Sequence, residues 1–149
     1  MSHLFRIGDP AFASRLAIPW AGYTVAWASS GTQPAIGNGT LGGSWSRVGD
    51  IFFYSITLIF GTTTTSGTGA WTFSLPLAVF NPFGMSSNGA GQAVGYHIGV
   101  SQIRARVTLN GAAISMYGNG QTVAWDATHP FTWANTDIAR IGGWFPVAP

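Results

Sequence analysis

The stretch "DIFFYSITLIF", residues 50–60, decides the fold of this 149-residue chain. Its apolar side chains recur with a period of two, the period at which the side chains of a β-strand point to the same side. The residues of one face are all large and apolar: Phe52, Tyr54, Ile56, Leu58 and Phe60. The residues of the other face are about half polar: Ile51, Phe53, Ser55, Thr57 and Ile59. The pattern predicts a long strand buried on at least one side.

The segments that follow continue this alternation. "GTTTTSGTG" (61–69) predicts a loop, and "AWTFSLP" (70–76) predicts a second strand that Pro76 ends. In "QAVGYHIGV" (92–100) one face is mostly small, which would let another sheet or subunit approach closely; its residues are Ala93, Gly95, His97 and Gly99.

A hairpin and a closing strand complete the pattern. In "QIRARVTL" (102–109), Arg104 and Arg106 point outward while the apolar residues between them point inward. "NGA" at Asn110 is a hairpin signal, and "AISMYG" (113–118) returns. "DIARIGGWFPV" (137–147) predicts a final strand.

The glycine-rich segment "IGNGTLGG" (36–43) upstream contains Gly37-x-Gly39-x-x-Gly42, the letters of a dinucleotide-binding fingerprint. A true fingerprint follows a buried strand, opens a helix and has an acid about 20 residues on. The turn-like "SSGTQPA" precedes this one, and no acid stands at the required distance. We interpret it as a turn into a strand, with glycines supplying positive φ.

Short strands joined by glycine-rich turns predict an all-β fold, an antiparallel β-sandwich of jelly-roll-like form over residues 21–149. Residues 1–20 differ, and we expect a short N-terminal arm there. Asp9 suits a helix cap, Pro10 suits the first helical position and Pro19 would end the helix, so a short helix over 10–17 is expected.

The low content of charged residues bears on what the protein binds. Charged residues make up 7% of the chain, against about 25% in an average globular protein. Either a Thr/Ser/Asn/Gly surface keeps the chain in solution, or much of its surface is buried against copies of itself or a larger assembly; we favour the second. The arginines are scattered apart from Arg104 and Arg106, which argues against nucleic-acid binding.

Neither a signal peptide nor an apolar run long enough to span a bilayer is visible in the sequence. We therefore expect a protein made in the cytoplasm, without a membrane partner. The chain has no cysteine, which excludes disulfides and thiolate metal sites.

The sequence has no convincing pattern of catalytic residues. The four acids, at positions 9, 50, 126 and 137, are widely separated, and no serine stands in a Gly-x-Ser-x-Gly context. We interpret Asp126 in "WDATHP" as a turn residue that bonds its own backbone. His97 and His129 lack metal-ligand spacing. For His97 we expect a structural or interface role, although three copies could meet on an ion at a trimer axis. We expect no enzyme activity, no cofactor and no metal.

Seven tryptophans raise the question of carbohydrate binding. Trp45, Trp71 and Trp125 stand where core residues would, whereas Trp20 and Trp133 are the better candidates for exposed, glycan-facing rings.

The segment from Pro34 to Pro76 resembles one that recurs in virion proteins of bacteriophages, especially phages of actinobacteria. The shared features begin with an Ile-Gly-Asn-Gly-Thr-Leu turn at Ile36–Leu41 and an Arg-x-Gly motif at Arg47–Gly49. A long hydrophobic strand at Ile51–Phe60, a Gly/Thr loop at Gly61–Thr65 and a Trp-x-Phe-Ser-Leu-Pro motif at Trp71–Pro76 follow. "DIARIGGWF" (137–145) is similar to the family's closing strand, although Arg140 interrupts it.

The resemblance implies a β-sandwich, jelly-roll-like head of a trimeric tail fibre or a virion decoration protein. Because only about twenty residues precede the sandwich, we expect a homotrimeric capsid decoration protein on the virion surface, assembled in the host cytoplasm. Its arm would contact the major capsid protein or another neighbour through Phe5, Arg6, Phe12, Arg15 and Leu16. The alternative is a receptor-binding head domain of a tail fibre or tail tip, which would recognise host cell-surface glycan through exposed, clustered aromatics in loops such as Thr62–Thr68 or Thr128–Trp133.

Overall fold

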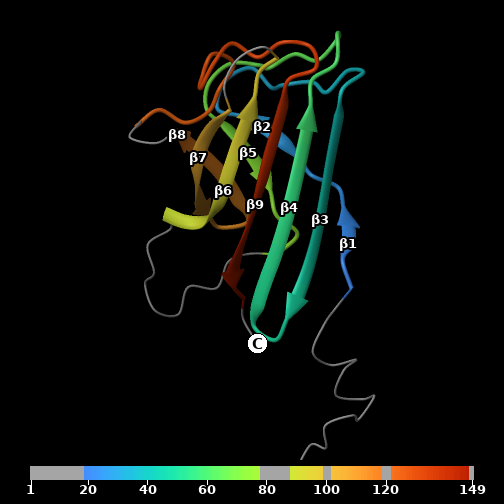
Figure 1. Ribbon diagram of the computed structural model, residues 1–149, viewed down its shortest axis with the longest axis vertical. Coiled ribbons are helices and arrows are strands. Elements are labelled where there is room, and N and C mark those ends of the chain that lie inside the picture. Colours follow the sequence, from blue (N-terminus) through green and yellow to red (C-terminus); the bar gives the residue numbers. More distant parts are fainter. Residues whose placement is uncertain (1–18, 78–87, 99–101, 119–121, 148–149) are drawn as a thin grey trace, which may run out of the picture.

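A computed structural model describes residues 19–77, 88–98, 102–118 and 122–147 of the chain, and of residues 88–90 and 110 the backbone alone. The described residues form nine strands and no helix (Figure 1). The strands are β1 (Ala21–Tyr23), β2 (Trp27–Ser29), β3 (Thr40–Val48), β4 (Ile51–Ile59), β5 (Trp71–Ser74), β6 (Asn88–Tyr96), β7 (Ile103–Asn110), β8 (Ala113–Gly118) and β9 (Ile138–Pro146). The helix expected over 10–17 lies outside the described residues, and the division of the chain at residue 20 stays a prediction.

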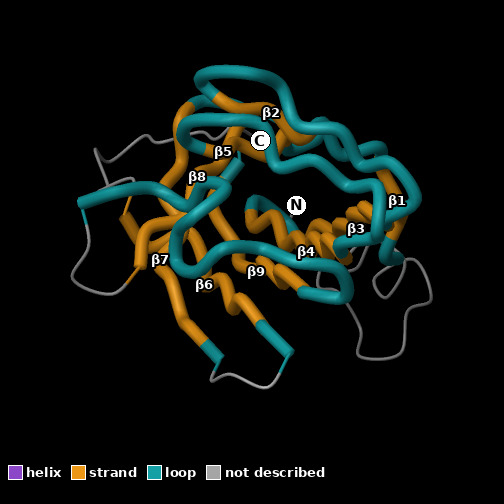
Figure 2. The backbone as a smooth tube through the Cα atoms, turned by 90° about the horizontal axis from the view of Figure 1, so that it is seen from above, coloured by secondary structure: helices purple, strands orange, loops and turns teal. Residues whose placement is uncertain are grey.

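The strands form one continuous sheet in the order β1-β3-β4-β9-β6-β7-β8-β5-β2, with every pairing antiparallel. The expected all-β antiparallel fold is confirmed. Within the described part of the chain, the sandwich arises from a single sheet that curls over on itself (Figure 2).

The curl follows from the connection between the two edge strands. β1 and β2 lie at opposite edges of the sheet, yet only residues 24–26 separate them in the chain. Four Cα–Cα steps span at most about 14 Å. The two edges must therefore lie close together, and a nine-stranded sheet meets that condition only by curling until it nearly closes.

Side chains form contacts across the seam, which is the junction where the two edges of the curled sheet approach each other. The Tyr23 hydroxyl of β1 donates a hydrogen bond to the Ser74 carbonyl of β5 at 3.2 Å. Ser74 also exchanges hydrogen bonds with the connecting residue Ala26, whose amide donates to the Ser74 Oγ at 2.8 Å. Between them Val25 is buried. Gly43 leaves the space that the Tyr23 ring and Val25 fill, because a Cβ at residue 43 would overlap both.

The core lies inside the curl and is rich in aromatic rings. β4 points Phe52, Tyr54, Ile56 and Leu58 inward with at most 2% of each side chain exposed, so the period-two prediction for this strand is confirmed. The tryptophans expected in the core take that place: Trp71 and Trp125 are fully buried, and Trp45 packs against the core with its ring stacked on Phe52 at 5.5 Å.

The hairpin predicted at Asn110 is confirmed, since β7 and β8 pair from Asn110 and Ala113 onward around Gly111 at φ 62°. The small face predicted for residues 92–100 has a different neighbour from the one expected. β6 ends at Tyr96, and Ala93 and Gly95 face the core of this same domain. A Cβ on Gly95 would lie 3.2 Å from the rings of Phe131 and Trp133, so a loop, not a second subunit, approaches this strand.

Candidate functional site

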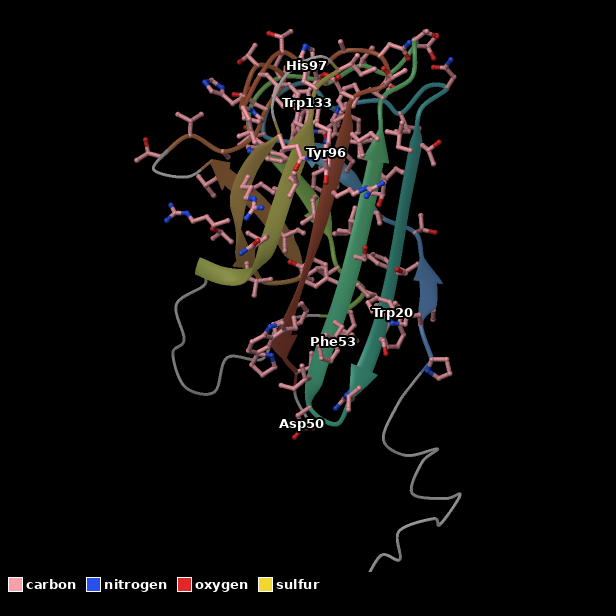
Figure 3. All side chains as sticks on the ribbon, in the orientation of Figure 1. Trp20, Asp50, Phe53, Tyr96, His97 and Trp133 are labelled. Carbon is pink, nitrogen blue, oxygen red and sulfur yellow. The ribbon has the colours of Figure 1, made fainter. Side chains whose placement is uncertain are left out.

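Four connections gather at one end of the curled sheet, which we call the loop end (Figure 1). They join β2 to β3, β4 to β5, β6 to β7 and β8 to β9, and their described residues are 30–39, 60–70, 97–98 with 102, and 122–137. The opposite end carries the β3–β4 turn and the last described residue, Val147, whose amide donates to the Asp50 carbonyl at 2.9 Å. Trp20, next to the first described residue, lies toward that opposite end as well (Figure 3), since the chain enters β1 beside the second half of β3. Both ends of the described chain are therefore remote from the loops.

The first two loops are tied together by polar side chains. Asn38 donates its side-chain amide to the Thr62 hydroxyl at 2.9 Å and accepts from the Thr63 amide at 2.9 Å. Thr64 donates its hydroxyl to the Ile36 carbonyl at 2.6 Å. Asn38, Thr62 and Thr63 remain exposed, so the surface here consists of hydroxyl and amide groups.

The glycine-rich segment that resembles a nucleotide fingerprint has its explanation here. Gly37 has φ 56°, as predicted for a turn. Gly39 matters for a different reason, because a Cβ there would overlap the Ile59 carbonyl; the glycine lets the two loops approach each other. β3 follows from Thr40 as a strand, which confirms that the segment is a turn into a strand.

A layer of aromatic rings lies beneath the loops, and Trp133 is at its centre. Its ring lies 4.5 Å from that of Phe131, 5.2 Å from that of Trp71, 5.3 Å from that of Phe60 and 5.5 Å from that of Trp125. Trp133 is only 7% exposed. The prediction that Trp133 is an exposed, glycan-facing ring is therefore wrong, because this layer needs a large ring to join the sheet to the β8–β9 loop.

Asp137 is the buried anchor of this end. Its side chain is fully buried and accepts hydrogen bonds from the Ala134 amide at 2.7 Å and the Ile98 amide at 3.3 Å, and its Oδ2 lies 2.8 Å from the His97 Nδ1. The carboxylate thus joins the β6–β7 loop to the β8–β9 loop. His97, labelled in Figure 3, has a structural role of the kind expected for it.

Asp126 organises a second turn. Its Oδ1 accepts from the Thr128 amide at 2.7 Å and the His129 amide at 2.8 Å, as the interpretation of "WDATHP" predicts. The His129 Nδ1 lies 3.0 Å from the same carboxylate. Partial burial raises the pKa of Asp126, but the hydrogen bonds from Thr128 and His129 outweigh it and hold the pKa below its ordinary value.

The described loop end carries many hydrogen-bonding groups. No group of three or more His, Cys, Asp or Glu among the described residues could hold a metal ion. Among the described loop residues, the aromatic side chains are buried or half-buried in the layer below, so the exposed aromatic cluster expected of a glycan site at 62–68 or 128–133 is not found there. Hydroxyls, amides and backbone groups remain for contact with a polar ligand.

An exposed aromatic cluster does occur at the other end, on the outer face of the sheet. Phe53 of β4 lies directly opposite Trp144 of β9, and Trp20 precedes the pair Ala21–Trp45, which places it beside Ser46 and hence in the same row. Figure 3 shows Trp20 and Phe53 near each other at this end. We call Trp20, Phe53 and Trp144 the aromatic row; Trp20 and Trp144 are 59% and 53% exposed. Trp20 is exposed as expected, and its glycan-facing role stays a prediction.

Trp144 is the member of this row that the sequence does not predict. The alternation assigns Phe53 to the outer face of its strand, but nothing in the local sequence singles out Trp144, because only the β4–β9 register brings the two together. The proposed arm residues Phe5, Arg6, Phe12, Arg15 and Leu16 lie outside the described residues, so their contact with a neighbour stays a prediction. No helix in the described ranges is both long and apolar enough to cross a membrane.

The chain is similar in sequence to a known phage tail fibre protein. No family model matches the chain. Over 128 residues it is 30% identical to the Mu-like prophage FluMu defective tail fiber protein of Haemophilus influenzae, a match that covers 81% of this chain and 19% of that protein. The chain thus spans about a fifth of the length of the curated relative it matches.

A solved structure shares the fold. The Dettilon tailspike protein superposes with a TM-score of 0.55 at 16% sequence identity, over 87% of this chain and 24% of that one. The two similarities together relate the chain to virion proteins of bacteriophages. The narrower resemblance to proteins from phages of actinobacteria stays a prediction.

Proposed function

We propose that this chain is a domain of a bacteriophage tail fibre, that it assembles as a homotrimer on the virion surface, and that it contacts host cell-surface glycan. The observation that carries the proposal is the 30% identity to a prophage tail fibre protein over most of this chain. The tailspike likeness agrees with it at the level of the fold.

The tail location takes precedence over the capsid decoration hypothesis. That hypothesis rests on the short segment before the sandwich and on an arm that would contact the major capsid protein. A match to one-fifth of a longer tail fibre protein supports a fibre domain instead, whatever the length of the segment before it.

The loop end is the surface we assign to the receptor. Trp20 and Val147, near the two ends of the described chain, both lie at the opposite end of the sheet, which leaves the loops at the far end of the domain. The exposed Asn38, Thr62 and Thr63 carry groups that hydrogen-bond to sugar hydroxyls. We assign these residues no catalytic role, and the domain acts by binding.

The outer face of β1, β3 and β4 supports the homotrimer. Its described residues include no charged side chain; they are small, polar or apolar, and they include Trp20 and Phe53 of the aromatic row. Depletion of charge and enrichment of aromatic rings mark the buried centres of protein interfaces. A second and third copy of the chain would cover this face.

Immunogold labelling tests the location. Antibody raised against the purified chain, applied to intact phage particles that carry it, should label the tail fibres. Label on the head shell would refute the tail proposal and restore the decoration hypothesis. Particles treated with pre-immune serum are the control.

Competition for adsorption tests receptor binding. Folded chain incubated with host cells before infection should slow phage adsorption, because it occupies the receptor. Heat-unfolded chain at the same concentration controls for non-specific coating of cells. Unchanged adsorption at saturating folded chain would refute host binding by this domain.

A further inference from the structure

Three of the six arginines come together on the outer face of β7, β6 and β9. Arg104 and Arg106 alternate with the buried Ala105 on β7, and Arg140 stands between the buried Ala139 and Ile141 on β9. All three arginines are exposed. The register links them: Arg104 lies opposite Val94 of β6, and Val94 lies opposite Arg140. We call Arg104, Arg106 and Arg140 the arginine face.

The spacing of the arginine face suits a ligand with repeated charges. Residues two apart on a strand are separated by about 7 Å, and strands separated by one neighbour by about 10 Å. No Asp within the described ranges forms an ion pair with any of the three; the ion pairs of described aspartates involve Arg47, His97 and His129. The positive charges are therefore not neutralised by the described part of the domain.

Aromatic rings support two of these guanidinium groups. The Arg106 Cζ lies 5.6 Å from the centre of the Tyr117 ring, and the Arg140 Cζ lies 5.7 Å from that of Tyr96. Such contacts orient a guanidinium and leave its N–H groups free to bind an acid in a fork geometry. Gln92, opposite Arg106 and exposed, adds an amide to the same surface.

We propose that the arginine face binds the acidic groups of an anionic cell-surface polysaccharide. The inference rests on the proposed function, since the domain must meet such a polymer at the host surface. The arginine face would be a second contact beside the loop end, and the inference names the chemical class of that receptor. Arginine forks fit carboxylate and phosphate groups, while tyrosine rings and an amide fit the sugar backbone. Nucleic acid is the poorer partner, because the proteins that bind it neutralise many more phosphates than three arginines can.

Binding to an acidic and to a neutral polysaccharide tests the proposal. Polygalacturonate carries a carboxylate on each sugar, and dextran is neutral. The full chain should bind polygalacturonate in biolayer interferometry with an affinity that falls as salt rises, and should not bind dextran. Each exposed ionic contact contributes about 1.5- to fivefold in affinity, so the triple variant R104Q/R106Q/R140Q should bind about three- to a hundredfold more weakly.

Single variants separate the arginine face from net charge. Arg140→Gln and Arg47→Gln each remove one positive charge, but Arg47 lies at the β3–β4 turn, away from the arginine face, paired with Asp50 at 3.5 Å. Arg140→Gln should weaken polygalacturonate binding while Arg47→Gln leaves it within about twofold. Arg140→Lys keeps the charge but loses the fork, and should fall between the two. Thermal melts of each variant report folding independently.

Three results would overturn the proposal that the arginine face binds an acidic polysaccharide. Equal binding of polygalacturonate by wild type and the triple variant would overturn the inference, as would equal loss in Arg140→Gln and Arg47→Gln. Binding of double-stranded DNA as tightly as polygalacturonate would also overturn it, since that is non-specific attraction. Failure here would leave gold labelling of tail fibres unaffected, so it is distinguishable from failure of the tail proposal.

Discussion

Single residues of the sheet and its loops differ sharply in their surroundings. Asp137 holds two loops through its buried carboxylate, whereas Asp50 lies at an exposed turn. Gly42 and Gly43 are neighbours on β3, yet one faces open space and the other faces Tyr23 and Val25. Variants of Asp137 and Asp50, and of Gly43 and Gly42, can therefore be compared as matched pairs.

Asp137→Ala should destabilise the domain by about 2–3 kcal/mol, because it leaves the Ala134 and Ile98 amides without the buried carboxylate that accepts from them. Asp50→Ala, whose carboxylate is 67% exposed, should cost less than about 1 kcal/mol. Urea unfolding followed by tryptophan fluorescence measures both. Equal destabilisation by the two variants would contradict the anchoring role.

Gly43→Ala should destabilise the domain by about 1–3 kcal/mol, since the added Cβ overlaps the Tyr23 ring and Val25 at the seam. Gly42→Ala has nothing within 4 Å of its Cβ and should be neutral or slightly stabilising. The same unfolding assay compares them. A Gly43→Ala protein as stable as Gly42→Ala would mean that the seam is not tightly packed.

At the scale of elements, the seam between β1 and β5 makes stability depend on alkaline pH. Burial raises the pKa of Tyr23 from 10.0 to about 12, and burial together with Tyr23 raises the pKa of Tyr54. The folded protein therefore holds these protons more tightly than the unfolded chain. For Tyr23 the contribution is complete below pH 10.0 and is lost as the pH rises from there to about 12.

Tyr23→Phe tests this prediction. At about pH 8 the variant should be about 1 kcal/mol less stable than wild type, because the hydrogen bond to Ser74 is lost. Phenylalanine does not titrate, so the difference should shrink as the pH rises from 10.0 to about 12. Unfolding measured at intervals across this range gives the two curves. A constant difference would show that Tyr23 ionises as it does in the unfolded chain.

For the whole molecule, the outer face of β1, β3 and β4, which has no charged side chain among its described residues, and the aromatic row predict that copies of the chain associate. Light scattering of the purified chain should give a mass near three times 15.6 kDa. Trp144→Glu places a charge in the aromatic row and should shift the mass toward one chain. Ile98→Glu, at the loop end and 67% exposed, is the matched control and should leave the mass unchanged. A wild-type monomer at all concentrations would contradict the homotrimer.

Much of the fold can be predicted from the sequence because the alternation of β4 and the turn at Asn110 are local signals. The inward face of β4, the core positions of Trp71 and Trp125, and the Asp126 turn follow from patterns a few residues long. The prediction for Trp133 fails because its burial depends on the rings of Phe60, Trp71 and Trp125, which the fold brings together from separate loops and strands.

The sequence by itself determined that the chain is β-rich, antiparallel and short of charge, since periodicity and composition need no knowledge of neighbours. Only the tertiary structure decided which strands are neighbours, and with them the candidate surfaces. Arg140 and Arg104 lie on the same surface because β6 pairs with both β9 and β7, and Trp144 lies opposite Phe53 because β9 pairs with β4. Such pairings join residues tens of positions apart, and hydrogen bonds between backbones, which are the same for every residue type, leave no mark of the partner in the local sequence.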